Sequence, residues 1–343
     1  MNVLIIGGTG LISTAVTRRL QALGHAVTHY NRGKRTAEFA TPPAVIAGDR
    51  YDHAAFVRQM RAAPRFDAVV EMIGYKPPDA HSLVEAFAGR ADHLVFASTV
   101  DVYQKPYRNH PVTEDHPRGG VNDYGRNKVY CEDVLIDADR RGDLPVTSIR
   151  LAYTYGEGAT WMVQGFANLG SPGLYFDRLL KGKPVISHGD GMSLWGATHI
   201  DDAATAFSGA LRNPKAFGRA YNVTPDETMV FDDYHRTIAR ALGAPGPTLV
   251  HIPSDLLRDL YPEYGENLVG NFMFDNCFDN TAAKRDLGYR YTISLEAGMR
   301  RFTSWYREKV GLRNADEDPV HDRILAAWAE LTGQMKARVG PQA

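Results

Sequence analysis

The feature that most constrains this fold is a glycine-rich turn between an apolar run and an amphipathic stretch near the N-terminus. The segment VLIIGGTGLIS begins with the apolar run Val3 to Ile6 and continues through Gly7, Gly8 and Gly10. From Ile12 to Leu23 the apolar residues recur at helical spacing. This order of strand, turn and helix is typical of a turn whose backbone N–H groups and helix N-terminus face a pyrophosphate.

The spacing of the glycines matches the pattern G-x-x-G-x-x-G except at its third position. Ser13 replaces the last glycine, and because serine is small we expect it to loosen the packing of helix and strand without blocking it. The alternative is a turn with a purely structural role. The residues predicted to contact a dinucleotide here are Gly7, Thr9, Gly10, Leu11 and Ile12.

Short apolar runs alternate with amphipathic stretches through the first half of the chain. Runs that predict strands follow at 26–30, 45–47, 66–70, 93–99 and 146–152, and helical patterns lie between them at 54–62, 80–88 and 129–141. This alternation predicts a doubly wound α/β domain with a parallel sheet covered on both faces. We expect this dinucleotide-binding domain over residues 1–165, with a helix at 198–212 returning to it.

The alternation of apolar runs and amphipathic stretches ends after about residue 160, where Gly, Pro, Trp and Tyr become frequent. We expect a smaller α/β substrate-binding domain over residues 166–343, ending in an amphipathic helix over 318–339. The sequence HIDD, with His199, Asp201 and Asp202, predicts a helix start because acidic side chains complement the helix dipole there.

Composition argues against several classes of function. The formal net charge is -1, so the basic excess usual in a nucleic-acid binder is missing. The two cysteines, Cys131 and Cys277, form no metal-binding pattern, and no metal is expected. The N-terminus lacks a basic n-region, and no apolar run approaches the ~18 residues of a membrane span. These observations predict a cytoplasmic protein.

The end of the second predicted strand bears on the choice of cofactor. NAD-selective sites usually place Asp or Glu there to bind the ribose hydroxyls. This chain has Asn31 followed by Arg32, with Lys34 close by. A guanidinium suits the 2′-phosphate of NADP, although a solvated basic loop is the plain alternative. The cofactor is therefore predicted as NAD or NADP, and Arg32 favours NADP.

A tyrosine and a lysine four residues apart raise the possibility of catalysis. Tyr124 and Lys128 lie in a stretch that predicts a helix, so they share one face. The pattern Y-x-x-x-K is common by chance and decides nothing alone. Other segments in order along the chain add weight to it: GGTGLIS, GDR at 48–50, STVDVY at 98–103, RLAYTYGEG at 150–158, HIDDAATAF at 199–207, AYNVT at 220–224 and DNTAAKRDLGY at 279–289.

Taken together, these segments resemble the extended short-chain dehydrogenase/reductase family, in its NAD-dependent epimerase/dehydratase group, over about residues 1–310. The resemblance implies a Rossmann-type fold with Tyr124 as the acid/base. A free tyrosine has a pKa near ~10, so it needs a neighbouring cation to act as a base at neutral pH. Lys128 would supply that charge and hold the nicotinamide ribose, and Thr99 would hydrogen-bond the reacting oxygen.

The resemblance also implies further cofactor contacts. Asp49 matches an acid that contacts the adenine, and Lys76 matches a phosphate contact in some members, although both could be solvated charges. The remaining cofactor-binding residues implied by the resemblance are Asn31, Arg32, Arg50, Ile73, Gly74, Ser98 and Tyr153.

Departures from the family pattern concern the substrate. The acid and base of the related 4,6-dehydratases are replaced by Val100 and Asp101, which makes dehydration an unlikely reaction. Trp195 stands where sugar-nucleotide epimerases usually carry a diphosphate-binding arginine. The residues implied in substrate binding are Tyr75, Thr99, Val100, Asp101, Tyr153, Trp161 and Trp195, and Tyr175 is a further aromatic candidate. Core packing is the alternative for Tyr153, Trp161, Tyr175 and Trp195.

Three functions follow from the resemblance. The first is a nicotinamide-dependent epimerase of a sugar or sugar nucleotide that works by transient oxidation. The second is an NADPH-dependent carbonyl reductase of sugar or secondary metabolism. The third is an RNA-associated protein without turnover, because NRGK, GDR and RLAYTYG also resemble chloroplast stem-loop-binding members. The family analogy further implies a homodimer formed through the helix of Tyr124, a sugar-like small-molecule substrate, and no nucleic-acid or membrane partner.

Overall fold

The computed structural model describes residues 1–34, 37–159, 171–317 and 319–340. The chain divides into two compact units, each assembled from three stretches of sequence. Unit 1 comprises Met1–Gly156, Gly196–Glu227 and Cys277–Ser294. Unit 2 comprises Glu157–Trp195, Thr228–Asn276 and Leu295–Ala343.

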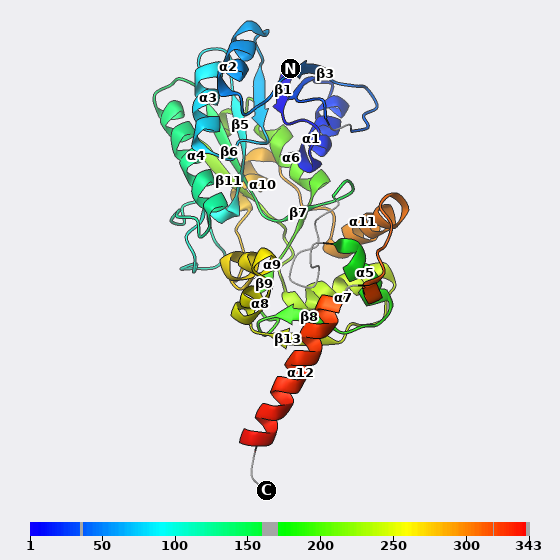
Figure 1. The fold of residues 1–343 in the computed structure, drawn as a ribbon. Coiled ribbons are helices and arrows are strands. Elements are labelled where there is room, and N and C mark those ends of the chain that lie inside the picture. Colours follow the sequence, from blue (N-terminus) through cyan, green and yellow to red (C-terminus); the bar gives the residue numbers. More distant parts are fainter. Residues whose placement is uncertain (35–36, 160–170, 318, 341–343) are drawn as a thin grey trace. The chain divides into compact units, whose positions relative to one another are not determined.

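Unit 1 is built on a seven-stranded sheet in which every neighbouring pair of strands is parallel (Figure 1). Its order is β11-β6-β5-β4-β1-β2-β3. The strands are β1 (Asn2–Ile6), β2 (Ala26–Asn31), β3 (Ala44–Ala47), β4 (Ala68–Glu71), β5 (Leu94–Thr99), β6 (Val146–Leu151) and β11 (Arg219–Val223). The predicted Rossmann-type parallel sheet is confirmed.

Helices cover both faces of this sheet, as the predicted double winding requires. One face carries α1 (Leu11–Ala22), α6 (Ile200–Ala210) and α10 (Thr281–Leu287), and the other carries α2 (His53–Ala62), α3 (Pro77–Phe87) and α4 (Asp123–Arg140). Alternation along β1 separates the two cores: Val3 and Ile5 face the first set of helices, whereas Leu4 and Ile6 face the second. All four residues are fully buried.

The strand order places a topological switch point at β1. The chain runs outward from β1 to β2 and β3 on one side, and outward to β4 and β5 on the other. Ligands of open parallel sheets bind at the carboxyl ends of the strands beside such a point. Gly7 follows β1, and the segment 72–76 follows β4, so both begin at this edge.

Short elements complete unit 1, and mainly helical elements build unit 2. Unit 1 also holds η1 (Val100–Val102), β7 (Thr154–Tyr155), β10 (Thr198–His199) and η3 (Pro214–Ala216). Unit 2 contains α5 (Pro172–Leu180), β8 (Val185–His188), β9 (Leu194–Trp195), β12 (Met229–Val230), α7 (Phe231–Leu242), β13 (Leu249–Ile252), α8 (Ser254–Leu260), α9 (Pro262–Asn267), η4 (Leu268–Phe272), α11 (Leu295–Lys309), η5 (Ala315–Glu317) and α12 (Pro319–Val339). β8 pairs with β13 in parallel, and β9 pairs with β12 antiparallel.

Five buried histidines make the fold sensitive to acid. Burial lowers the pKa to about 4 for His29, His93 and His188 and to about 3 for His235 and His321. Above pH 6.5 each histidine is neutral in both the folded and the unfolded chain. Below pH 6.5 the unfolded chain binds protons that the folded chain cannot take up until its lowered pKa is reached, so stability falls.

We therefore expect the melting temperature to drop steeply between pH 6.5 and 4, with on the order of 3 kcal/mol lost per histidine at the acid end. The His93→Gln variant isolates one contribution, because His93 accepts a hydrogen bond from the Arg212 amide at Nδ1 and cannot do so when protonated. Calorimetry from pH 4.5 to 7.5 should show a shallower slope for this variant and an unchanged slope for His81→Gln, at an exposed position. Equal melting temperatures at pH 4.5 and 7 would contradict this account.

Candidate active site

The turn after β1 packs so tightly against its neighbours that its first glycine cannot be replaced. Gly7 has φ +83°, and a Cβ atom there would lie 2.7 Å from Cγ2 of Ile73. Its N–H donates to the carbonyl of Tyr30 at the end of β2. A left-handed backbone and this close approach both require glycine.

Ser13 closes the turn through its side chain. Its buried hydroxyl donates to the carbonyl of Gly7 at 2.7 Å and accepts from the amide of Gly10 at 2.8 Å. The amides of Leu11 and Ile12 lie in the first turn of α1, where a helix offers no acceptors of its own. The turn thus fits a dinucleotide pyrophosphate, because these first-turn N–H groups attract an anion.

The structure brings Thr99, Tyr124 and Lys128 together beside the carboxyl end of β5. Thr99 is the last residue of β5, and Tyr124 and Lys128 lie one turn apart in α4. The helix starts at Asn122, whose side chain accepts from the amide of Gly125 at 2.8 Å. This N-cap fixes the turn of α4 that carries Tyr124.

Lys128 is buried, and its ammonium group donates two hydrogen bonds within unit 1. Its Nζ donates to the carbonyl of Ala97 at 2.7 Å and to that of Gly74 at 2.8 Å. The rings of Phe96 and Tyr75 lie 4.5 and 4.9 Å from Nζ. Burial lowers the pKa of Lys128 to about 8, so a cation remains at neutral pH next to the tyrosine, and aromatic faces stabilise it.

The hydroxyl of Tyr124 lies among groups that keep it protonated. Burial raises the pKa of Tyr124 well above its usual value, the charge of Asp101 and the neighbouring Tyr75 raise it further, and a hydrogen bond with Thr99 opposes them. The residue as a whole is 42% exposed, so solvent reaches part of the side chain although its hydroxyl is desolvated. A protonated phenol beside a threonine hydroxyl is suited to donate a proton.

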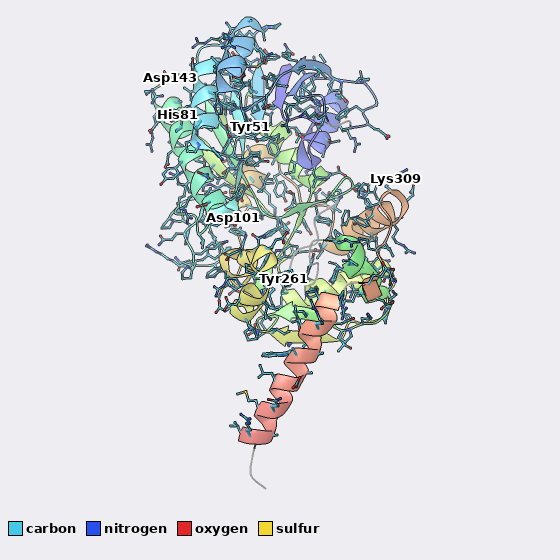
Figure 2. All side chains as sticks on the ribbon, in the orientation of Figure 1. Tyr51, His81, Asp101, Asp143, Tyr261 and Lys309 are labelled. Atoms are coloured by element: carbon cyan, nitrogen blue, oxygen red, sulfur yellow. The ribbon has the colours of Figure 1, made fainter. Side chains whose placement is uncertain are left out.

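Asp101 has a cationic partner one turn along the chain. Its Oδ1 accepts from Nζ of Lys105 at 3.2 Å, and the Lys105 side chain is only 1% exposed (Asp101 is labelled in Figure 2). Burial lowers the pKa of Lys105, whereas Asp101 acts in the opposite direction. The amide of Asp101 donates to the hydroxyl oxygen of Thr99 at 3.2 Å. Asp101 was predicted from the sequence as a site residue, whereas Lys105 was not.

Gly125 sets how closely α4 approaches η1. A Cβ atom at this position would lie 2.4 Å from the carbonyl oxygen of Asp101. Any larger residue would therefore push Tyr124 away from Thr99. This role of Gly125 was not predicted, although a glycine inside a helical pattern is the signal for such a close approach.

A buried ion-pair network joins β5, α4 and β6 beneath these residues. Glu132, one turn after Lys128, pairs with Arg150 at 2.8 Å and accepts from the hydroxyl of Ser98 at 2.6 Å. Burial alone would raise the pKa of Glu132, but Arg150 brings it below its usual value. Arg150 also donates to the hydroxyl of Tyr103 at 3.0 Å. Ser98 was predicted to bind the cofactor, and its side chain ties Thr99's strand to the helix of Tyr124.

Comparison with known proteins identifies the group to which this arrangement belongs. The sequence profile of the NAD dependent epimerase/dehydratase family matches residues 3–224. The chain belongs to this family. The resemblance inferred from the sequence segments is thereby confirmed.

Relatives of this epimerase/dehydratase chain carry different functions. A chloroplast stem-loop binding protein of 41 kDa from Arabidopsis thaliana is 27% identical, over 87% of this chain and 77% of its own length. A 2′-dehydrokanamycin reductase from Streptomyces kanamyceticus is 27% identical, over 81% and 77%. A UDP-glucose 4-epimerase from Mycolicibacterium smegmatis is 25% identical, over 90% and 99%.

A solved structure shares the fold of the epimerase/dehydratase chain. The UDP-glucose 4-epimerase of Thermotoga maritima superposes with a TM-score of 0.72 at 18% identity, covering 90% of this chain and all of that one. At this identity the likeness concerns the fold alone.

Arg50, another predicted cofactor residue, is buried and holds the segment that follows β4. Its guanidinium donates to Glu71 at 2.7 Å, to the hydroxyl of Ser82 at 2.9 Å and to the carbonyl of Asp79 at 2.7 Å. Glu71 in turn accepts from the amide of Ile73 at 2.8 Å. Arg50 therefore acts through Glu71 to position Ile73, the residue packed against the glycine turn.

The remaining predicted cofactor residues of unit 1 lie at exposed or half-buried positions. Asn31 ends β2, and its Oδ1 accepts from the amide of Gly33 at 2.8 Å, while Arg32 is exposed. Asp49 is exposed and accepts from the amide of Tyr51 at 3.0 Å. Lys76 is exposed at the start of α3. In this member of the family the end of β2 thus presents an arginine and no carboxylate.

The predicted substrate residues lie in several environments. Tyr75 is 40% exposed, with its ring 6.4 Å from that of Tyr124, whereas Val100 is buried in a small cluster with Val102. Tyr153 is half-buried, and its carbonyl accepts from the amide of Thr198 at 2.8 Å. Trp161 lies outside the described residues.

Two aromatic candidates belong to the core of unit 2. Trp195 is 1% exposed, with its ring 4.5 Å from that of Tyr234. Tyr175 is fully buried, and its hydroxyl lies 2.7 Å from Nδ1 of His235. These contacts match the core-packing alternative that the sequence left open for both residues.

His199 caps a helix, as its sequence predicts. It is the N-cap of α6, where its Nδ1 accepts from the amide of Asp201 at 3.2 Å. Asp202 accepts from the amides of Thr292 and Ile293, which joins α6 to a later segment.

Across the described part of the chain, no three His, Cys, Asp or Glu side chains gather as a metal site would need. Within the same residues, none of the helices combines the length and apolar character required to cross a membrane.

Proposed function

We propose that this chain reduces a carbonyl group of a small, sugar-like substrate, with NADPH as the hydride donor. The observation that carries the proposal is the charge around Tyr124. Burial and Asp101 raise the pKa of its phenol, so the proton is held on Tyr124, as a group that donates to a carbonyl oxygen requires. Reduction of a carbonyl consumes a proton at the oxygen, whereas an epimerase must begin by removing one.

Each residue of the site then has one task. When bound, the nicotinamide supplies the hydride to the carbonyl carbon. Tyr124 donates its hydroxyl proton to the carbonyl oxygen, and the Thr99 hydroxyl hydrogen-bonds the same oxygen. The buried charge of Lys128 stabilises the phenolate that remains.

The cofactor assignment rests on the end of β2. Asn31 offers no carboxylate for the ribose hydroxyls, and its side-chain oxygen already accepts from Gly33. The exposed guanidinium of Arg32 suits a 2′-phosphate. The similarity to a 2′-dehydrokanamycin reductase also supports reduction of a sugar-like ketone.

The test combines nucleotide identification with kinetics. Nucleotide released from the denatured protein is identified first, and oxidation of NADPH and NADH is then followed at saturating levels of sugar ketones. Arg32→Asp should raise the KM for NADPH about 10- to 100-fold, because a charge-assisted hydrogen bond is lost, and should leave the KM for NADH unchanged or lower. Arg61→Gln, at an exposed position in α2, is the matched control.

Three results would overturn the proposal. Tightly held NAD near one per chain, with isomerisation of a sugar and no net NADPH consumption, would identify an epimerase, the function that the sequence favoured first. A stronger preference for NADH than for NADPH would remove Arg32 from the cofactor site. Binding of RNA without binding of any nicotinamide nucleotide would point to the RNA-associated members.

A further inference from the structure

The last helix of unit 2 carries an apolar stripe along its whole length. The stripe is formed by residues three or four positions apart on α12: Val320, Ile324, Ala327, Trp328, Leu331, Met335 and Val339. Such spacing places these side chains on one face of a helix. The two halves of this α12 stripe lie in different surroundings.

The first turn of α12 is firmly attached to unit 2. The ring of His321 is buried, and its Nε2 accepts from the amide of Ile186 at 3.2 Å. Asp322 pairs with Arg178 at 2.6 Å and with Lys183 at 3.0 Å. These contacts fix the direction in which the rest of the helix extends.

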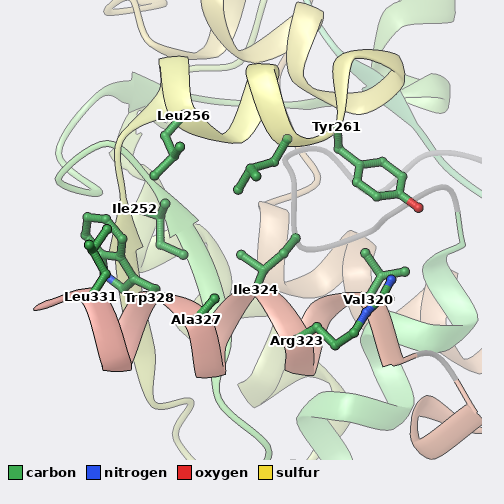
Figure 3. A pocket seen from close by; sticks show the side chains of 10 residues that line it. Ile252, Leu256, Tyr261, Val320, Arg323, Ile324, Ala327, Trp328 and Leu331 are labelled. Atoms are coloured by element: carbon green, nitrogen blue, oxygen red, sulfur yellow. The ribbon is translucent and has the colours of Figure 1, made fainter. Parts of the chain in front are cut away.

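The first half of the stripe forms one wall of an apolar groove (Figure 3). The opposite wall comes from β13 and α8, and Figure 3 shows Leu256 and Tyr261 across the groove from Ile324 and Val320. The groove encloses about 380 Å³, and Trp328 and Leu331 line it as well. Its lining is apolar except for Arg323 and the hydroxyl of Tyr261.

The second half of the stripe is exposed. Leu331 is 55% exposed, Met335 64% and Val339 75%, and every residue from Gly333 to Gly340 is exposed. Large apolar side chains that continue a half-buried stripe into solvent are a feature of interaction surfaces. The exposed half begins where the groove ends, at Leu331.

The charges beside the exposed half of the stripe indicate which kind of partner would bind there. Glu330 lies at one end of it, and Lys336 and Arg338 lie toward the other. In an antiparallel pair of α12 helices the acid of each copy lies level with the bases of the other, and the two-fold axis repeats this contact. A lipid surface would instead select a basic face, which one acid and two bases do not provide.

We propose that two copies of this chain associate through their α12 helices, packed antiparallel. With the two-fold axis between Gly333 and Gln334, Trp328 faces the partner's Val339. The partner's Val339 and the partner's Met335 then cover the groove end formed by Trp328 and Leu331. One symmetric contact thereby buries both the exposed half of the stripe and the open groove.

The helix expected from family analogy to form a dimer has a different surface. The positions of α4 that face solvent are Asp123, Arg126, Tyr130, Asp137 and Arg140, together with the catalytic Tyr124. Apart from the two tyrosines this surface is charged, and charged residues are depleted in the cores of interfaces. The apolar surface that a partner would remove from solvent lies on α12.

The experiment measures self-association of the full chain by analytical ultracentrifugation over a range of concentrations. The wild type should dimerise, and Leu331→Glu or Met335→Glu should raise the dissociation constant at least ~30-fold, because a charge replaces a central apolar contact. Ala329→Glu adds the same charge on the opposite face of α12 and should change the dissociation constant less than ~3-fold. These surface positions lie outside the catalytic site, so activity of the variants reports that they are folded.

A charge exchange tests the antiparallel arrangement. Glu330→Lys and Arg338→Glu should each weaken the dimer, and the double variant should restore it. The proposal would be overturned by a wild-type protein that is monomeric at ~100 μM, and by a double variant that is weaker than both single variants. A dimer lost in Tyr130→Glu but kept in Leu331→Glu would assign the interface to α4, and binding to anionic vesicles that Met335→Glu abolishes would assign the stripe to a membrane.

Discussion

Replacement of Tyr124 by phenylalanine is expected to lower kcat about a thousandfold, because proton donation by a positioned side chain contributes ~10²–10⁴ to a rate. Phenylalanine keeps the ring that lies 6.4 Å from Tyr75 and removes only the hydroxyl that interacts with Thr99. The fold and the binding of nucleotide should therefore remain. Steady-state kinetics and a titration that follows NADPH fluorescence separate the two effects.

The control for this variant lies on the same helix. Tyr130→Phe removes a hydroxyl from an exposed residue of α4 that is 56% accessible, and it should leave kcat unchanged. A Tyr124→Phe protein with more than a tenth of the wild-type kcat would show that another group donates the proton. Loss of nucleotide binding in this variant would instead mean that the hydroxyl serves the cofactor site.

The second large effect is expected from Arg150→Met. This change leaves Glu132 buried with its carboxylate deprived of its main partner, and breaking a buried pair in this way costs about 3–5 kcal/mol. Arg118 contacts the same carboxylate at 3.1 Å and limits the loss. Chemical denaturation should show a lower midpoint with an unchanged slope.

Two further variants show whether the uncompensated charge is the cause. Arg141→Met removes an arginine from an exposed ion pair with Asp143 and should cost less than ~1 kcal/mol. Adding Glu132→Gln to Arg150→Met should recover part of the stability, because it neutralises the carboxylate left behind. If the double variant is no more stable than Arg150→Met, the lost stability comes from packing of the arginine side chain.

Local sequence patterns were sufficient to predict much of the structure of unit 1. The turn at Gly7 could be predicted because a strand, a glycine cluster and a helix follow one another directly in the sequence. Tyr124 and Lys128 could be paired because they lie one helical turn apart. The alternation of apolar runs located the strands from β1 to β6. Each of these features depends on neighbours within a few residues, which is the range that periodicity reports.

Features created by distant contacts could not be predicted in the same way. Strand β11 was recognised only as a family segment, because its place at the edge of the sheet depends on β6, about seventy residues earlier. The ion pair of Glu132 and Arg150 joins two elements through folding alone. The role of Gly125 appears only once η1 lies against α4. Residues that position Tyr124 and Lys128 thus depend more on tertiary structure than these two residues themselves do.

The interleaving of the two units has a consequence for how the protein is made. A ribosome that has released only residues 1–156 has produced six of the seven strands of the main sheet, with β6 as an open edge. That edge stays unpaired until β11 emerges, and α10, which packs on β11, follows later still. During this interval the nascent chain presents an unpaired parallel strand, the kind of surface on which other chains aggregate. Fragments that end after β6 and before β11, between residues 152 and 218, should therefore be less soluble than the full chain.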